Sequence, residues 1–245
     1  MDYRLSLMAG IDVPIPELQL TAHIPTIKDI AYMGEQSFFL AIQYLCLEKE
    51  ALVQDKALLS SLSNFQVLMK VLQQTKDSDK KSAIITLLRL LFPDRSAAIT
   101  KNSIILMIPN GPTTLIDNDN FDTFQKVIKE VLCVNNLFQG NNIIYNPSGP
   151  RAKRIADKIM QGRIKVAQQK SKEGDNTSIL TRYISILSIA QGIPITEYSS
   201  YNMFQLFDAM DRYTKKTEWD IDLKVRLAGG KPDKQVESWM DELHP

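Results

Sequence analysis

Few of the residue types that carry out chemistry in enzymes are grouped in this sequence. The two histidines, His23 and His244, have no Cys, Asp or Glu at the spacing of a zinc site or a catalytic cluster. His23 lies on the outer side of a predicted strand, and His244 is the penultimate residue. The chain also contains no nucleophile elbow and no Walker-type loop. We therefore expect a protein without catalytic residues, metal ligands or cofactor.

Two short motifs resemble ligand-binding loops. Gly229-Gly230-Lys231 lacks the upstream glycine and the following hydroxyl residue of a phosphate loop, so we interpret it as a helix end. Asp117-Asn118-Asp119-Asn120 offers oxygens that calcium prefers, but the glycine and distal glutamate of a calcium loop are absent. Helix capping explains it better. Catalysis by an acidic pair without a recognisable motif remains the alternative.

The overall composition is that of a globular protein. The chain has 245 residues, of which 44% are hydrophobic and 23% are charged, and its net charge of +1 favours no class of partner. Cys46 and Cys133 lie in apolar helical patterns, which favours two buried thiols in a reduced intracellular setting over a disulfide. An acidic second residue and the lack of a long apolar run argue against a signal peptide or a membrane span.

The N-terminal part predicts an α+β domain. Residues 3–8 and 18–24 alternate polar and apolar side chains and predict two strands of a hairpin, with residues 10–16 as its loop. Thr26, followed by Asp29 at the third position, predicts a capping box at the start of a helix. Further helices are predicted by apolar periodicity at residues 27–33, 35–52, 65–74, 82–92 and 121–132.

A second hairpin is predicted near residues 97–117. Residues 104–108 form an apolar β run, Asn110-Gly111 is a strong turn dipeptide, and residues 113–116 resume an extended pattern. Residues 97–100 are a candidate third strand. The sequence thus predicts a mostly α-helical α+β fold with two small hairpins.

The best linker is residues 140–150, which are rich in Gly, Asn, Pro and Ser. We therefore predict an N-terminal α+β domain over residues 1–145 and a C-terminal helical domain over residues 151–245. The second domain is expected to contain helices at residues 151–172, 177–190 and 232–243.

The helix predicted at residues 151–172 is strongly basic. It has eight basic residues and one acidic residue, a net charge of +7, whereas the rest of the chain sums to −6. Such a run can contact nucleic acid phosphates or an acidic protein surface. A solvated helix face is the alternative, and no aromatic residue interleaves the run to stack on bases. The candidate contact residues are Arg151, Lys153, Arg154 and Lys158.

Residues 201–230 carry the densest apolar pattern in the chain. Three-and-four spacing predicts a helix, although residues 219–227 also alternate as a half-buried strand would. The pairs Asp220–Lys224 and Asp222–Arg226 favour the helix. A helix that is apolar on two sides must bury both, and a partner could cover the second. The predicted partner-binding residues are Met203, Phe207, Met210, Trp219 and Trp239.

Several of these stretches resemble tail or baseplate assembly chaperones of tailed phages. The resemblance is carried by DYRLSLMAGIDVPIPELQL near the N-terminus, by Thr26-Ile27-Lys28-Asp29-Ile30, and by Phe204-Gln205-Leu206-Phe207-Asp208 with Gly229-Gly230 and Trp239. It covers the two ends of the chain and neither the second hairpin nor the basic run. It implies no catalytic residues. It implies binding to apolar or coiled-coil-forming segments of another virion protein, which prevents that protein from aggregating before assembly.

We accordingly expect a non-enzymatic protein of the host cytoplasm during infection. Its expected partner is a tape-measure, tail-tube or baseplate protein, and the pattern is compatible with a homo-oligomer. A structural subunit of the virion is the first alternative, and a nucleic-acid-binding protein that uses the basic run is the second.

Overall fold

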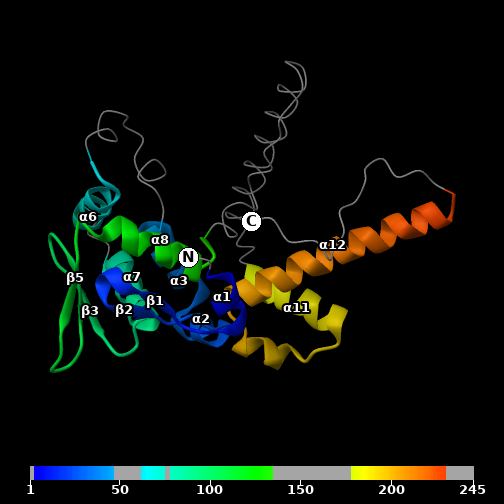
Figure 1. The fold of residues 1–245 in the computed structure, drawn as a ribbon, viewed down its shortest axis with the longest axis horizontal. Helices are drawn as coiled ribbons and strands as arrows, with labels where there is room; N and C mark the ends of the chain where they lie inside the picture. Colours follow the sequence, from blue (N-terminus) through cyan, green and yellow to red (C-terminus); the bar gives the residue numbers. More distant parts are fainter. Residues whose placement is uncertain (1–2, 47–61, 75–77, 135–177, 230–245) are drawn as a thin grey trace, which may run out of the picture.

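Most of the chain that the structure describes is helical, with two small antiparallel sheets (Figure 1). The structure, a computed structural model, describes residues 3–46, 62–74, 78–134 and 178–229. This confirms the predicted mostly helical α+β class. The helices are α1 (Arg4–Ala9), α2 (Ile27–Met33), α3 (Glu35–Cys46), α6 (Asn64–Gln74), α7 (Ser78–Leu91), α8 (Phe121–Val131), α11 (Ile179–Gln191) and α12 (Met203–Leu227), with short 3-10 turns η1 (Pro16–Leu18) and η2 (Ile195–Ser200).

The N-terminal hairpin exists, but its first strand is displaced from the predicted one. Strand β1 (Val13–Ile15) pairs antiparallel with β2 (Leu20–Ala22), and η1 joins them. The prediction of a strand at residues 3–8 was wrong, because this stretch forms α1. Leu7 is buried and Tyr3 packs against the core, a spacing of four, while Leu5 between them is 80% exposed. The apolar side chains that meet the core therefore follow a helical period.

The second sheet is confirmed, including its third strand. Strands β3 (Ser96–Ile99), β4 (Ile104–Met107) and β5 (Thr113–Ile116) pair antiparallel in that order. The turn between β4 and β5 contains Asn110 at φ 59°, a left-handed conformation that Asn tolerates. Ile104, Leu106 and Ile116 are fully buried, so one face of this short sheet joins the core.

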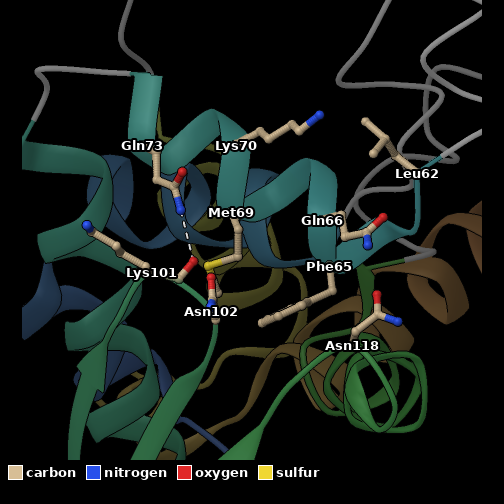
Figure 2. A pocket seen from close by; sticks show the side chains of 9 residues that line it. All are labelled: Leu62, Phe65, Gln66, Met69, Lys70, Gln73, Lys101, Asn102 and Asn118. Carbon is tan, nitrogen blue, oxygen red and sulfur yellow. Dashed lines mark hydrogen bonds between the residues drawn. The ribbon is translucent and has the colours of Figure 1, made fainter.

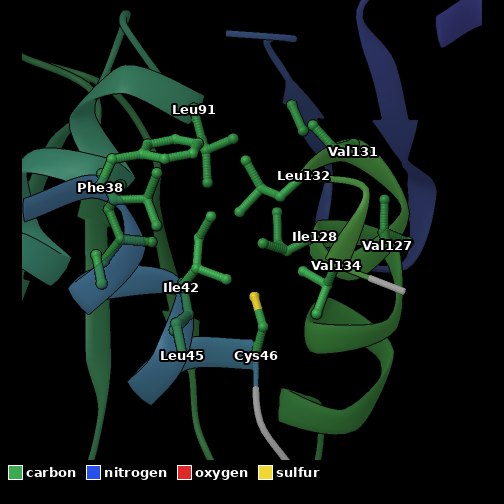
Figure 3. Packing of buried hydrophobic residues seen from close by; sticks show 14 of the residues in the cluster. Phe38, Ile42, Leu45, Cys46, Leu91, Val127, Ile128, Val131, Leu132 and Val134 are labelled. Atoms are coloured by element: carbon green, nitrogen blue, oxygen red, sulfur yellow. The ribbon is translucent and has the colours of Figure 1, made fainter. Parts of the chain in front are cut away.

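The core of the N-terminal part lies between α3, α7 and α8. Figure 3 shows Phe38, Ile42 and Leu45 of α3 facing side chains from the other two helices, among them Leu91 and Ile128. All five are fully buried. Helix α6 packs on α8, where the rings of its Phe65 and of Phe121 lie 5.1 Å apart. The predicted amphipathic faces of these helices are thus the ones that the fold buries.

The C-terminal segment joins this body where two helices begin. Thr26 caps α2 and Asn202 caps α12, each in a capping box with the third helical residue. The two cap residues also form an antiparallel β-bridge with each other, and the Ile27 N–H donates to the carbonyl of Tyr201 at 2.7 Å. The buried Asn202 side chain donates to the carbonyl of Leu7 at 2.7 Å. We call this group of contacts the cap junction.

Helix α12 is continuous through residues 219–227, which settles the choice between helix and strand in favour of the helix. It runs away from the rest of the molecule in Figure 1, with α11 beside its first half. Along α12, Tyr213 is the last residue that packs against the core. Gly229, at φ 81°, follows the helix end as predicted.

Several predictions fall on residues outside the described part of the chain. They are the end of the helix predicted at 35–52 beyond Cys46, the linker at 140–150, the basic run at 151–172 with its four candidate contact residues, and the helix at 232–243. The two-domain division at residues 145–151 lies there as well. These stay predictions.

The cap junction predicts a stability difference between two helix caps. Asn202→Ala removes the acceptor for the Gln205 N–H, and it leaves the Leu7 carbonyl with only the longer hydrogen bond from the Gly10 N–H, at 3.3 Å. We expect the free energy of unfolding to fall by about 2–3 kcal/mol, measured by urea denaturation. Ser178→Ala in α11 removes only an exposed cap bond to the Thr181 N–H and should cost about 1 kcal/mol. Equal losses would contradict the special role of Asn202.

Candidate functional site

His23 lies close to two carboxylates, but both have structural roles. Its Nδ1 is 3.0 Å from Asp12 Oδ1, and its Nε2 is 4.0 Å from Asp29 Oδ2. Asp12 also accepts from the Ile24 N–H, and Asp29 completes the capping box of α2 with Thr26. These contacts hold the end of the hairpin to the start of α2. Within residues 3–46, 62–74, 78–134 and 178–229, no group of three or more His, Cys, Asp or Glu side chains could hold a metal ion.

The acidic loop before α8 uses its oxygens in hydrogen bonds within the loop and in one from Ser63, whose hydroxyl donates to Asn118 Oδ1. Asn120 Oδ1 accepts from the Asp117 N–H, and Asp117 Oδ1 accepts from the Asp119 N–H, both at 3.0 Å. The Asn120 side chain also donates to the carbonyl of Leu115. Asn120 is the N-cap of α8, although its side chain makes no cap hydrogen bond and instead stabilises the preceding turn. The structure therefore supports a local structural role for this loop.

Both cysteines are free and buried. Burial raises the pKa of Cys46 to about 12, against a smaller opposing effect of Lys129. Burial, with a smaller contribution from Glu130, raises the pKa of Cys133 to about 12. A thiol must ionise to act as a nucleophile or a metal ligand. Neither cysteine is set up for such chemistry at neutral pH.

A pocket of about 340 Å³ lies between α6 and the loop that joins β3 to β4 (Figure 2). Phe65 and Met69 supply apolar walls, and Gln73 donates to the carbonyl of Lys101 at 2.8 Å. Lys70 and Lys101 point away from each other in Figure 2, so no cationic centre forms. The pocket is lined by Leu62, Phe65, Gln66, Met69, Lys70, Gln73, Lys101, Asn102 and Asn118.

The predicted partner-binding residues lie in three different environments. Met203 and Phe207 are 3% and 6% exposed and belong to the core, where the Phe207 ring contacts that of Tyr183 at 5.9 Å. Met210 is half-buried and packs against the same core. Trp219 is half-buried farther along α12, and Trp239 lies outside the described residues. The first part of the predicted surface is therefore covered by this chain itself.

The exposed apolar surface of α12 lies beyond Tyr213, in residues 214–227, which we call the distal segment. Its four large aliphatic side chains are substantially exposed, and Trp219 is half-buried. On a helix, Ile221 and Val225 share one side, and we call this pair the inner face because it continues the stripe of Met203 and Phe207. Trp219, Leu223 and Leu227, each four residues apart, occupy the opposite side, which we call the outer face. The exposed fractions are 56% for Ile221, 46% for Leu223, 40% for Val225 and 79% for Leu227.

The alternation of apolar and charged residues at 219–227 was the sequence signal for the exposed apolar surface of the distal segment. Side chains that alternate in type project from two opposite sides of a helix, so a strand-like pattern on a helix predicts two apolar faces. The sequence predicted apolar groups on two sides of such a helix, but the predicted binding residues combined its covered first half with its exposed second half. The four most exposed apolar residues of the distal segment were not among the predicted binding residues.

A buried acidic side chain lies between the two faces. Asp222 is 7% exposed, and its Oδ2 accepts from Arg226 Nε at 2.8 Å, which confirms this predicted pair. Its Oδ1 is buried and has no hydrogen-bond partner among the residues that the structure describes. A buried acceptor without a partner costs stability, so this position favours a further donor.

The comparison with known families points to phages. Residues 169–244 match the model of the family described as YomV second domain. This family is phage-derived, with YomV from a Bacillus prophage, so the match suggests a phage protein. It covers less than a third of the chain but includes the described helices α11 and α12. No curated protein and no solved structure matches the chain.

That match agrees with the phage part of the resemblance and gives no information on a tail or baseplate role. In the described ranges, none of the helices has the length and apolar character that a membrane span requires.

The raised thiol pKa values predict slow labelling of the native protein. With both pKa values at about 12, very little thiolate forms at pH 8, and burial excludes the reagent. We expect the disulfide reagent DTNB, which releases one coloured aromatic thiolate for each protein thiol that reacts, to react with almost no thiol of the native protein. After unfolding in guanidinium it should react with two thiols per chain. A rapid single equivalent from the native protein would show that one thiol is accessible.

Proposed function

We propose that this protein is a non-enzymatic phage assembly protein that binds a helical segment of another virion protein. The observation that supports this function best is the exposure of apolar side chains along the distal segment of α12. Exposed contiguous apolar surface rimmed by charged residues is typical of protein interaction sites. The binding surface in this proposal is the outer face, Trp219, Leu223 and Leu227.

The spacing of the outer face suits a helical partner. Three apolar positions four residues apart form a stripe that rises about 12 Å along the helix. Such a stripe packs into the groove of a second amphipathic helix, which presents apolar residues at three-and-four spacing. Trp219 would be the anchor, because large aromatic side chains concentrate binding energy in interfaces. The proposed surface retains Trp219 from the predicted binding residues. Leu223 and Leu227, which are exposed, take the place of Met203 and Phe207.

A chaperone of tail assembly is the form of this function that we favour. The match to a phage-derived family at residues 169–244 supports the phage setting, and it includes the whole outer face. The resemblance to tail and baseplate assembly chaperones supports the finer role. The partner would be a tape-measure, tail-tube or baseplate protein, and the site of action would be the host cytoplasm during infection.

A substitution on the outer face tests this function. Leu223→Lys with Leu227→Lys places two charges in the proposed interface, and we expect the partner's affinity to fall about 10–100-fold. The measurement is the soluble fraction of the co-expressed tape-measure or tail-tube protein. Ile189→Lys on α11 is the matched control, because Ile189 is 84% exposed and lies outside the distal segment. Equal solubility of the partner with and without the wild-type protein would refute the chaperone function.

Mass spectrometry of purified particles separates the chaperone from a structural subunit. A chaperone is absent from finished particles, whereas a tail, connector or baseplate subunit is present in fixed copy number. Detection at fixed copy number would assign the outer face to an interface within the virion.

A further inference from the structure

We propose that two copies of this protein pair through the inner faces of their distal segments, with the two helices antiparallel. The inner face is Ile221 and Val225, on the side of α12 opposite the outer face. The pairing itself does not depend on the proposed function. A pair would present two outer faces, and only the use of these faces for binding rests on the proposed function.

The inner face continues a stripe whose first half is already buried. Met203 and Phe207 of this stripe lie in the core, and α11 packs beside them. Beyond Tyr213 the core ends, yet α12 continues for 14 residues, a rise of about 21 Å. Ile221 and Val225 are then 56% and 40% exposed. The stripe needs a covering element there, and the fold supplies none among the described residues.

The order of charges in the distal segment identifies a second copy as the covering element. Lys215 and Lys216 lie at the start of the segment, and within residues 217–227 the acidic residues Glu218, Asp220 and Asp222 come before the basic residues Lys224 and Arg226. Two antiparallel copies centred at Asp222 place Asp220 level with the partner's Lys224, and Glu218 level with the partner's Arg226. Opposite charges thus face each other on both sides of the centre. A parallel pair would set like charges level, which is unfavourable.

The buried Asp222 lies at the centre of this arrangement. Its Oδ1 has no partner within the described chain, although the side chain is only 7% exposed. In the antiparallel pair the partner's Arg226 lies about 6 Å away along the axis, within reach of its long side chain. A buried polar group of this kind fixes the register of paired helices. The two Asp222 side chains are level with each other in this register, so the partner's Arg226 both supplies the donor and offsets their repulsion, while Asp220 and Glu218 lie level with basic residues of the partner.

The contact between two distal segments in this register is short, since they overlap over residues 217–227, about three helical turns. It is smaller than the interfaces of stable complexes, which bury about 1,200 Å² or more. We therefore expect a concentration-dependent dimer with a dissociation constant in the micromolar range.

A charge exchange tests the pairing by sedimentation of the full-length protein. In Asp220→Lys, and separately in Lys224→Glu, each of the two symmetric charge pairs becomes repulsive, and we expect dimer affinity to fall about tenfold or more. An equimolar mixture of these two variants restores both attractions and should dimerise. Both substitutions are at exposed positions of one helix, and circular dichroism checks that helix content is unchanged. Dimerisation of the mixture but of neither variant alone would be hard to explain by misfolding.

Engineered cysteines test the orientation. In the proposed pair, two copies of Ile221→Cys lie about 3 Å apart along the axis, whereas two copies of Thr214→Cys lie about 24 Å apart. A short thiol cross-linker should therefore join the first variant and not the second. The natural cysteines do not compete, because both are buried.

Three results would overturn the pairing: a wild-type protein that sediments as a monomer throughout the micromolar range, no rescue in the mixture, or equal cross-linking of Thr214→Cys and Ile221→Cys. None of these results would change the solubility assay with a virion protein, because that assay depends on the outer face. Conversely, a failed solubility assay with an intact dimer would refute the proposed function and leave the pairing in place.

Discussion

The architecture depends on one contact, the cap junction between the starts of α2 and α12. Each of these helices begins with N–H groups that need acceptors, and Thr26 and Asn202 supply them from their own side chains. The two cap residues also pair as a β-bridge, so the residues that satisfy the two helix ends also join segments far apart in the sequence. The Asn202 bond to the Leu7 carbonyl and the Gln205 bond to the Met8 carbonyl add α1 to the same junction. The direction of α12 is therefore set at its first turn.

This anchoring divides α12 into two halves with different environments. Near the junction, Met203, Leu206 and Phe207 belong to one continuous core with the N-terminal helices, and α11 covers a further side. Past Tyr213 none of the described apolar core residues lies on the helix, and Ile221, Leu223, Val225 and Leu227 are exposed. In the described residues the core holds the first half of the helix, so the proposed contact of the distal segment with a second polypeptide leaves that core intact. Burial and exposure along one helix thus separate the half that stabilises the core from the half that the proposed binding uses.

Local features of this fold could be predicted from sequence, and long-range ones could not. The capping box at Thr26 and Asp29 depends on a spacing of three residues, so the sequence was sufficient to predict it. The prediction of a strand at residues 3–8 was wrong because six residues are too few to distinguish the period of a strand from that of a helix. Only the packing of Leu7 and Tyr3 against the core decides between the two. The bond from Asn202 to Leu7 joins residues 195 positions apart, and no local pattern encodes it. For the same reason, periodicity identified the apolar face of α12 but not which half of it the chain covers.

The distal segment has apolar side chains on two opposite sides of one exposed helix. Alternation of apolar and charged residues places Ile221 and Val225 on one side, and Trp219 with Leu223 on the other. A lone helix with this pattern leaves both sides in water, which is unfavourable for apolar surface. Covering only one side with another protein would leave the second exposed. Since the charges run from acidic to basic along the same residues, the segment is complementary to its own antiparallel copy. Self-pairing on one side and a different partner on the other satisfy the whole pattern, whereas either contact alone does not.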